Sequence, residues 1–109
     1  MKYGLRLPTF SPKYALGDEP VGLEQMGAYL RHAEDLGIEG AFIIDHMLYA
    51  DPLYSCSWLD PLTLLSAWTG VTRTIKLGTA IVVLPLHQPV LFAKQWAKLD
   101  FLPNCLRMR

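Results

Sequence analysis

Two short runs of uninterrupted apolar residues constrain the fold of this chain more than any other feature of its sequence. They are GAFII, residues 40–44, and AIVVL, residues 80–84. Neither run alternates with polar residues, as a strand with one solvent-exposed face would. Strands that are apolar throughout are covered on both faces and are typical of parallel sheets. The sequence therefore predicts an α/β fold with a parallel sheet.

Patterns of helical period lie between the predicted strands. A first strand is expected at residues 2–7 and a third at residues 75–84. The apolar residues of the expected helices repeat at three- and four-residue intervals, so each set lies on one helical face. The sets are Leu23, Met26, Leu30 and Ala33; then Leu62, Leu65 and Trp68, or Leu64 with Trp68; then Phe92, Trp96 and Leu99.

Residues that favour helix ends bound these patterns. Asp18 is the predicted N-cap of the first helix, and Gly37 is predicted to end it in a left-handed conformation. The Asp-Pro pair at residues 60–61 and Pro89 are predicted to start the second and third helices. Strand and helix thus alternate three times, as in the right-handed units of a parallel sheet. The helices can cover only one face of a three-stranded sheet, so the other face needs a different cover.

Composition narrows the class of protein. The chain has 109 residues, 51% of them hydrophobic, and a formal net charge of zero. A globular fold is therefore expected, and a nucleic-acid-binding surface is not. No apolar run is long enough to cross a bilayer, and the start of the chain lacks the apolar core of a signal peptide. Cys56 and Cys105 form neither a metal-type pair nor a disulfide framework. We expect a cytoplasmic chain with no membrane partner.

Two titratable residues, Asp45 and His46, follow the second predicted strand directly. In parallel sheets and barrels, catalytic and binding groups gather beyond the carboxyl ends of the strands. On an extended strand the two side chains point to opposite sides, with His46 on the side of Phe42 and Ile44. From its position alone, His46 fits a histidine bonded to a backbone carbonyl better than a catalytic group.

Other candidate residues give weaker signals. His32 fits a solvated helix face, and His87 fits a loop or capping position; no histidine or cysteine spacing indicates a metal site. The aromatic residues of the second loop, Tyr49, Tyr54 and Trp58, fit either a substrate entrance or simple packing of that loop. A flavodoxin-like binding domain shares the alternation of strands and helices. That fold needs more strands and a phosphate loop after the first strand, where TFSPKY, residues 9–14, has no glycine.

Three blocks of the sequence resemble the beginning of a luciferase-like monooxygenase. They are MKYGLRLP, HAEDLGIEGAFIIDH and DPLTLLSAWTGVTRTIKLGTAIVVLPLHQPVLFAKQWAKLD. They occur in the family's order and spacing from Met1 to about Leu102. The resemblance implies the first three units of a TIM (β/α)8 barrel. It also implies a flavin-dependent oxidoreductase or monooxygenase that uses reduced FMN or a deazaflavin and acts on a small-molecule substrate.

The resemblance assigns roles to residues at the rim of the barrel. The family position matching His46 lies beside the reactive face of the flavin, so His46 is the expected catalytic acid/base. Asp45 matches a position that contacts the cofactor in some deazaflavin-dependent members. The family also has a non-proline cis peptide under the flavin ring. It matches Ala80–Ile81, preceded by Gly78 and Thr79, and these four residues are the expected cofactor-binding segment.

The final residues depart from the family pattern. The family continues from LD into a fourth strand, whereas residues 103–109 form a divergent tail that resembles a shifted reading frame. A complete barrel needs about 250 residues. An alternative function follows from this departure: a non-catalytic remnant that self-associates as a homo-oligomer through its uncovered sheet face and open strand edges.

Overall fold

A computed structural model describes residues 1–7, 22–47 and 58–102 of the chain. Its strands are β1 (Gly4–Arg6), β2 (Gly40–Ile43) and β3 (Lys76–Thr79). Its helices are α1 (Leu23–Asp35), α2 (Pro61–Thr69) and α3 (Pro89–Phe101), and a short 3-10 helix, η2 (Leu84–Leu86), precedes α3. The predicted alternation of strand and helix is confirmed. Across the described ranges, no helix is both long and apolar enough to span a membrane.

The three strands form one parallel sheet in the order β1-β2-β3. Gly4 pairs with Gly40, which in turn pairs with Lys76. Paired residues point to the same side of a sheet, so this register decides which side chains share a face. The order leaves β1 and β3 as the edge strands, as the sequence predicts.

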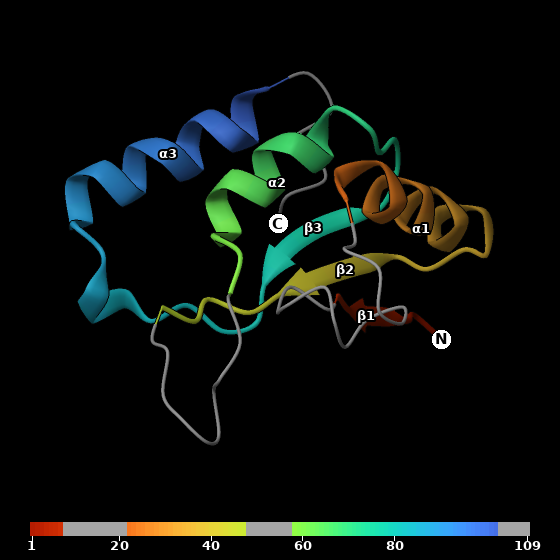
Figure 1. Cartoon of the computed structure of the whole chain (residues 1–109), viewed down its shortest axis with the longest axis horizontal. Coiled ribbons are helices and arrows are strands. Elements are labelled where there is room, and N and C mark those ends of the chain that lie inside the picture. The colour runs from red at the N-terminus through yellow and green to blue at the C-terminus, as the bar shows by residue number, and fades with distance from the viewer. Residues whose placement is uncertain (8–21, 48–57, 103–109) are drawn as a thin grey trace.

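All three helices lie on the same side of the sheet (Figure 1). Burial along β2 and its extension follows this arrangement. Ala41, Ile43 and Asp45 are buried, and the three residues that alternate with them from Phe42 to His46 are only half-buried. The prediction that the helices cover one face is confirmed. We call the opposite face, which carries Phe42 and His46, the inner face.

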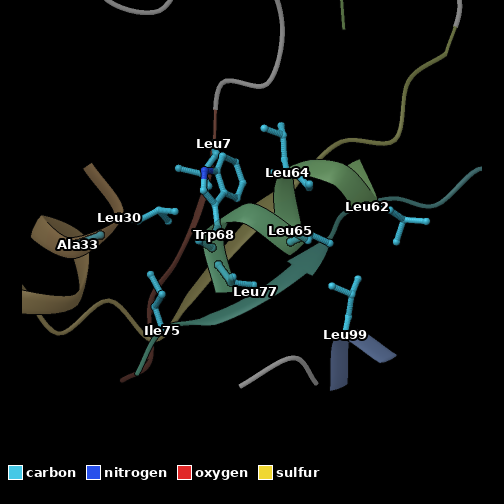
Figure 2. Packing of buried hydrophobic residues seen from close by; sticks show 12 residues of the cluster. Leu7, Leu30, Ala33, Leu62, Leu64, Leu65, Trp68, Ile75, Leu77 and Leu99 are labelled. Carbon is cyan, nitrogen blue, oxygen red and sulfur yellow. The ribbon is translucent and has the colours of Figure 1, made fainter. Parts of the chain in front are cut away.

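A buried cluster joins the helices to the sheet (Figure 2). It consists of Leu7, Leu30, Ala33, Ala41, Ile43, Leu62, Leu64, Leu65, Trp68, Ile75, Leu77 and Leu99. Both alternative sets predicted for the second helix are buried in α2, and Trp68, which belongs to both sets, is fully buried. Phe92 and Trp96 are half-buried and pack against the cluster, as predicted for the third helix.

The first helix starts later than predicted. It begins at Leu23, and the N–H of Gly22 donates to the side chain of Gln25 at 2.6 Å. The N-cap position is occupied by Gly22; Asp18, which was predicted for it, lies outside the described residues. Leu23 is 50% exposed and does not join the buried face. The first turn of α1 lies beyond the buried cluster. The residues of α1 that join the cluster or pack against it begin at Met26.

The other helix ends agree with the sequence. Gly37 has a φ of 78°. Its N–H donates to the carbonyl of Glu34, and the N–H of Ile38 donates to that of Ala33, both at 2.9 Å. This is the left-handed cap expected of a glycine after the last helical turn. At the start of α2, Asp60 Oδ2 accepts the backbone N–H of residue 63 at 2.7 Å.

Glu34, near the end of α1, also fixes the turn that leads into β3. Its Oε1 accepts the backbone N–H groups of Arg73, Thr74 and Ile75 at 2.7, 2.5 and 2.8 Å. Burial raises the pKa of the Glu34 carboxyl, but the hydrogen bonds together outweigh it and the pKa is lowered. The ionised carboxylate therefore ties α1 to the strand that carries the expected cofactor-binding segment.

The third strand is shorter than predicted. Residues 75–84 were expected to be extended throughout, but β3 ends at Thr79 and η2 occupies Leu84–Leu86. The backbone of Ala80 and Ile81 still bonds to Ile43 and Asp45, but further on the N–H of Val83 donates to the side chain of Asp45 at 2.9 Å and not to a strand neighbour.

Candidate active-site rim

The carboxyl ends of β2 and β3 continue side by side beyond their last ladder positions. The N–H of Ala80 donates to the carbonyl of Ile43 at 2.8 Å, and the N–H of Asp45 donates to the carbonyl of Ile81 at 3.2 Å. The peptide bond between Ala80 and Ile81 is cis, where the family resemblance implies it. These bonds place that peptide next to the backbone that carries His46.

His46 is half-buried, and the alternation along β2 puts it on the inner face with Phe42. Its ring packs against Trp58, with ring centroids 4.4 Å apart and planes tilted by 51°. Trp58, one of the three loop aromatics, thus contacts the candidate catalytic histidine. Tyr49 and Tyr54 lie outside the described residues.

Asp45 points the other way, toward the helices, and is only 3% exposed. Its Oδ2 accepts two hydrogen bonds, from the N–H of Val83 at 2.9 Å and from Nε2–H of His87 at 2.6 Å. Its Oδ1 is buried and has no hydrogen-bond partner among the residues that the structure describes. The Oδ2 atom is therefore committed to the connection between β3 and α3.

His87 is the functional candidate that sequence reasoning did not pair with Asp45. It lies 42 residues from Asp45 in the sequence, and neither spacing nor periodicity links the two. Its ring also stacks on Phe92, with centroids 4.4 Å apart. A signal existed, because the segment LPLHQP follows the third strand and must reach the same rim as Asp45. His87 follows η2 at its C-cap position, which confirms the loop or capping position predicted for it.

The expected cofactor-binding segment divides between the two faces. Gly78 pairs with Phe42 on the inner face, and a Cβ atom added to Gly78 would meet that ring at 3.3 Å. Thr79 pairs with Ile43 on the side of the helices and is half-buried. Ala80 is exposed and Ile81 is 77% exposed, so these two residues form the open part of the rim.

Other features lie away from this rim. An open groove of about 410 Å³ runs between α2 and α3, and a smaller hollow of about 160 Å³ lies at the amino ends of the strands. His32 is exposed on α1, as predicted. Within residues 1–7, 22–47 and 58–102, no three His, Cys, Asp or Glu side chains come together in a way that could hold a metal ion.

Comparison with solved structures supports the barrel interpretation. The chain is similar to coenzyme F420-dependent tetrahydromethanopterin reductase from Methanopyrus kandleri, with 25% sequence identity and a TM-score of 0.64. The similarity covers 91% of this chain and 23% of the reductase chain. The chain therefore corresponds to under a quarter of that structure.

Comparison with families gives the same result at the level of sequence. No curated protein sequence matches the chain. The family model for the luciferase-like monooxygenases matches residues 1–104, which is nearly the whole sequence. This chain belongs to the luciferase-like monooxygenase family.

Proposed function

We propose that this chain forms the rim of a site for reduced FMN or a deazaflavin, and that His46 exchanges a proton with the bound ring system. The observation that carries the proposal is the position of His46 beside the Ala80–Ile81 peptide, set by the two backbone hydrogen bonds between β2 and β3. Membership of a luciferase-like family and similarity to an F420-dependent reductase support this choice of cofactor.

The residues at the rim fit a planar, largely apolar ring system. Such a ring needs an apolar support and a nearby group that can take up or release a proton. Ala80 and the exposed side chain of Ile81 offer the support. An imidazole is the side chain best suited to proton exchange near neutral pH, and His46 supplies one on the inner face. The packing of Trp58 against His46 limits the orientations of its ring.

From these positions we assign separate roles to the cofactor and to the protein. When bound, a reduced flavin or deazaflavin supplies a hydride or activates oxygen. The protein orients that ring against Ala80 and Ile81, and His46 gives or accepts the accompanying proton at an imidazole nitrogen. Phe42 fills the inner face below this level, against Gly78. Asp45 faces the helices, so we propose a supporting role for it and not a contact with the ring.

Cofactor binding by the chain tests the proposal. FMN and coenzyme F420 are each titrated with the protein, and binding is followed by their fluorescence. We expect one of the two to bind, and His46→Ala to weaken that binding several-fold, because it removes the imidazole contact. His32→Ala is the matched control, since His32 is exposed on α1, and should bind like the unmodified chain. Absence of binding by both cofactors would contradict the proposal.

The proton-exchange role needs a separate measurement. The bound cofactor is reduced chemically, and its reoxidation by a suitable acceptor is timed in His46→Ala and in the unmodified chain. We expect slower reoxidation in the variant by about 100-fold, the lower range for a lost acid/base group. Imidazole added to the solution should restore part of the rate. Equal rates in the two proteins would rule out proton exchange by His46.

A second candidate function is self-association without catalysis. It is favoured by the inner face of the sheet, where Phe42 and Ile44 are half-buried and no described helix packs. The edge strands β1 and β3 add unpaired backbone groups. Light scattering on the purified chain separates the two candidates. An oligomer that binds neither cofactor would support this second function, and a monomer that binds one of them stoichiometrically would exclude it.

A further inference from the structure

Asp45 has a supporting role in the proposed function, and the contacts of its side chain indicate what that role is. It is a buried carboxylate at the rim, yet its side chain points away from the inner face on which the cofactor is proposed to lie. Both of its hydrogen bonds go to the connection between β3 and α3, residues 80–88. We call this connection the rim segment.

We infer that Asp45 and His87 are positioning residues, which hold the rim segment so that the Ala80–Ile81 peptide stays beside His46. This inference deepens the proposed function and rests on it for the role of that peptide. Neither residue touches the proposed cofactor; each acts through the backbone of the rim segment.

Apolar packing does not explain how the middle of the rim segment is held. Leu84 and Leu86 are 62% and 52% exposed, and Val83 is also exposed. Their side chains therefore contribute little burial. The two hydrogen bonds to a single oxygen of Asp45 span the same stretch, from Val83 to His87. Bonds to a charged acceptor are stronger than neutral ones, and burial shields them from water.

The ring of His87 is also held by aromatic residues of α3. Its side chain is 11% exposed, and its ring stacks on Phe92, which meets the edge of Trp96 at a centroid distance of 5.9 Å. Phe92 and Trp96 pack against the buried cluster. The hydrogen bond from His87 to Asp45 thus joins the base of α3 to the extension of β2.

Asp45 contacts the rim segment at two nearby residues. The N–H of Asp45 donates to the carbonyl of Ile81, and its carboxylate accepts from Val83, two residues further on. One residue therefore holds the rim segment through its backbone and through its side chain. Loss of the side-chain bonds leaves the Ala80–Ile81 peptide attached through its two backbone bonds, from Ala80 to Ile43 at 2.8 Å and from Asp45 to Ile81 at 3.2 Å, with the residues that follow it released.

Amide hydrogen exchange of the whole chain, measured residue by residue by NMR, tests this inference without any cofactor. We expect Asp45→Ala and His87→Ala each to speed exchange at Val83 by about tenfold, as expected for one lost hydrogen bond. Exchange at Leu30 in α1 should not change. His87→Gln keeps a donor that can reach the carboxylate and should restore most of the protection. Glu39→Ala breaks an exposed ion pair at the opposite end of the strands and serves as the control.

Two results would overturn the inference. One is unchanged exchange at Val83 in Asp45→Ala and His87→Ala. The other is an equal increase at Val83 and Leu30, which would make the pair a general contributor to stability and not a positioning device. If one of the cofactors binds, His87→Ala should also weaken its binding, and His87→Gln should recover it. If neither cofactor binds, the proposed function fails, and the exchange data still decide the role of the pair.

Discussion

The ring of Phe42 in β2 lies directly against the backbone of Gly78 in β3. A Cβ atom added to Gly78 would stand 3.3 Å from two carbons of that ring. Gly4 and Gly40 face the same ring, at 2.9 and 3.1 Å from the corresponding Cβ positions. Glycines on all three strands thus make room for one aromatic side chain on the inner face, below the level of His46.

This contact predicts a specific interaction between Gly78 and Phe42. Gly78→Ala should lower the free energy of unfolding by about 1 kcal/mol, because the added methyl group crowds the ring. In a Phe42→Ala background the same substitution should have almost no effect. Urea denaturation of the two single variants and the double variant measures the difference. An equal effect of Gly78→Ala in both backgrounds would show that the ring is not what the glycine accommodates.

The bonds accepted by Glu34 predict a dependence of stability on acid. Its pKa is lowered in the folded chain, so its contribution is complete above the ordinary glutamate value of 4.5 and is lost as the pH falls through the lower folded value. Glu34→Gln should be less stable than the unmodified chain at pH 7 and should converge toward it in acid. Thermal unfolding from pH 7 to pH 3 measures this.

Glu39 provides the comparison for Glu34. The hydrogen bond and charge of Lys2, with the charge of Lys76, lower the pKa of the Glu39 carboxyl; its side chain is 37% exposed and that of Lys2 is 79% exposed. Salt screens exposed pairs far more than partly buried ones. The pH effect of Glu39→Gln should therefore disappear at high salt, and that of Glu34→Gln should persist. Loss of both effects in salt would contradict the structural role given to Glu34.

The start of α2 predicts a cap effect. Asp60 Oδ2 accepts both the N–H and the hydroxyl of Thr63, at 2.7 and 2.6 Å. Asp60→Ala should lower the free energy of unfolding by about 1 kcal/mol, and Asp60→Ser should recover most of the loss. Chemical denaturation compares the three chains. If Asp60→Ser were no better than Asp60→Ala, the cap would not be the source of the effect.

Local patterns were sufficient to predict most of the fold from the sequence. The apolar run at residues 40–44 gave the central strand, and Gly37 and Asp60 gave helix ends that the structure confirms. The run at residues 80–84 was wrongly predicted to be a buried strand, because it lies beyond β3 and is mostly exposed. The predicted end of β3 was wrong: the chain leaves the strand after Thr79, and Val83 donates instead to the side chain of Asp45, 38 positions away in the sequence. A local sequence pattern cannot show a contact between residues so far apart in the chain.

For the candidate site too, some features could be predicted from the sequence, and contacts between distant residues could not. The cis peptide at Ala80–Ile81 was predicted from the resemblance to a family and not from periodicity, and the structure confirms it. The direction of Asp45 and His46 to opposite sides followed from strand alternation. The sequence placed the segment LPLHQP at the rim but did not predict the bond between Asp45 and His87, because the two residues are 42 positions apart and no spacing or periodicity links them.

The position of the proposed cofactor is tested most directly by NMR titration of the chain with the reduced form of whichever cofactor binds. Amide chemical shifts are followed for every assigned residue. We expect the largest changes at His46, Ala80 and Ile81, and small changes at Leu91 and Lys98, which line the groove between α2 and α3. Changes centred on that groove, with His46 and Ile81 unaffected, would contradict the assignment of the rim as the cofactor site.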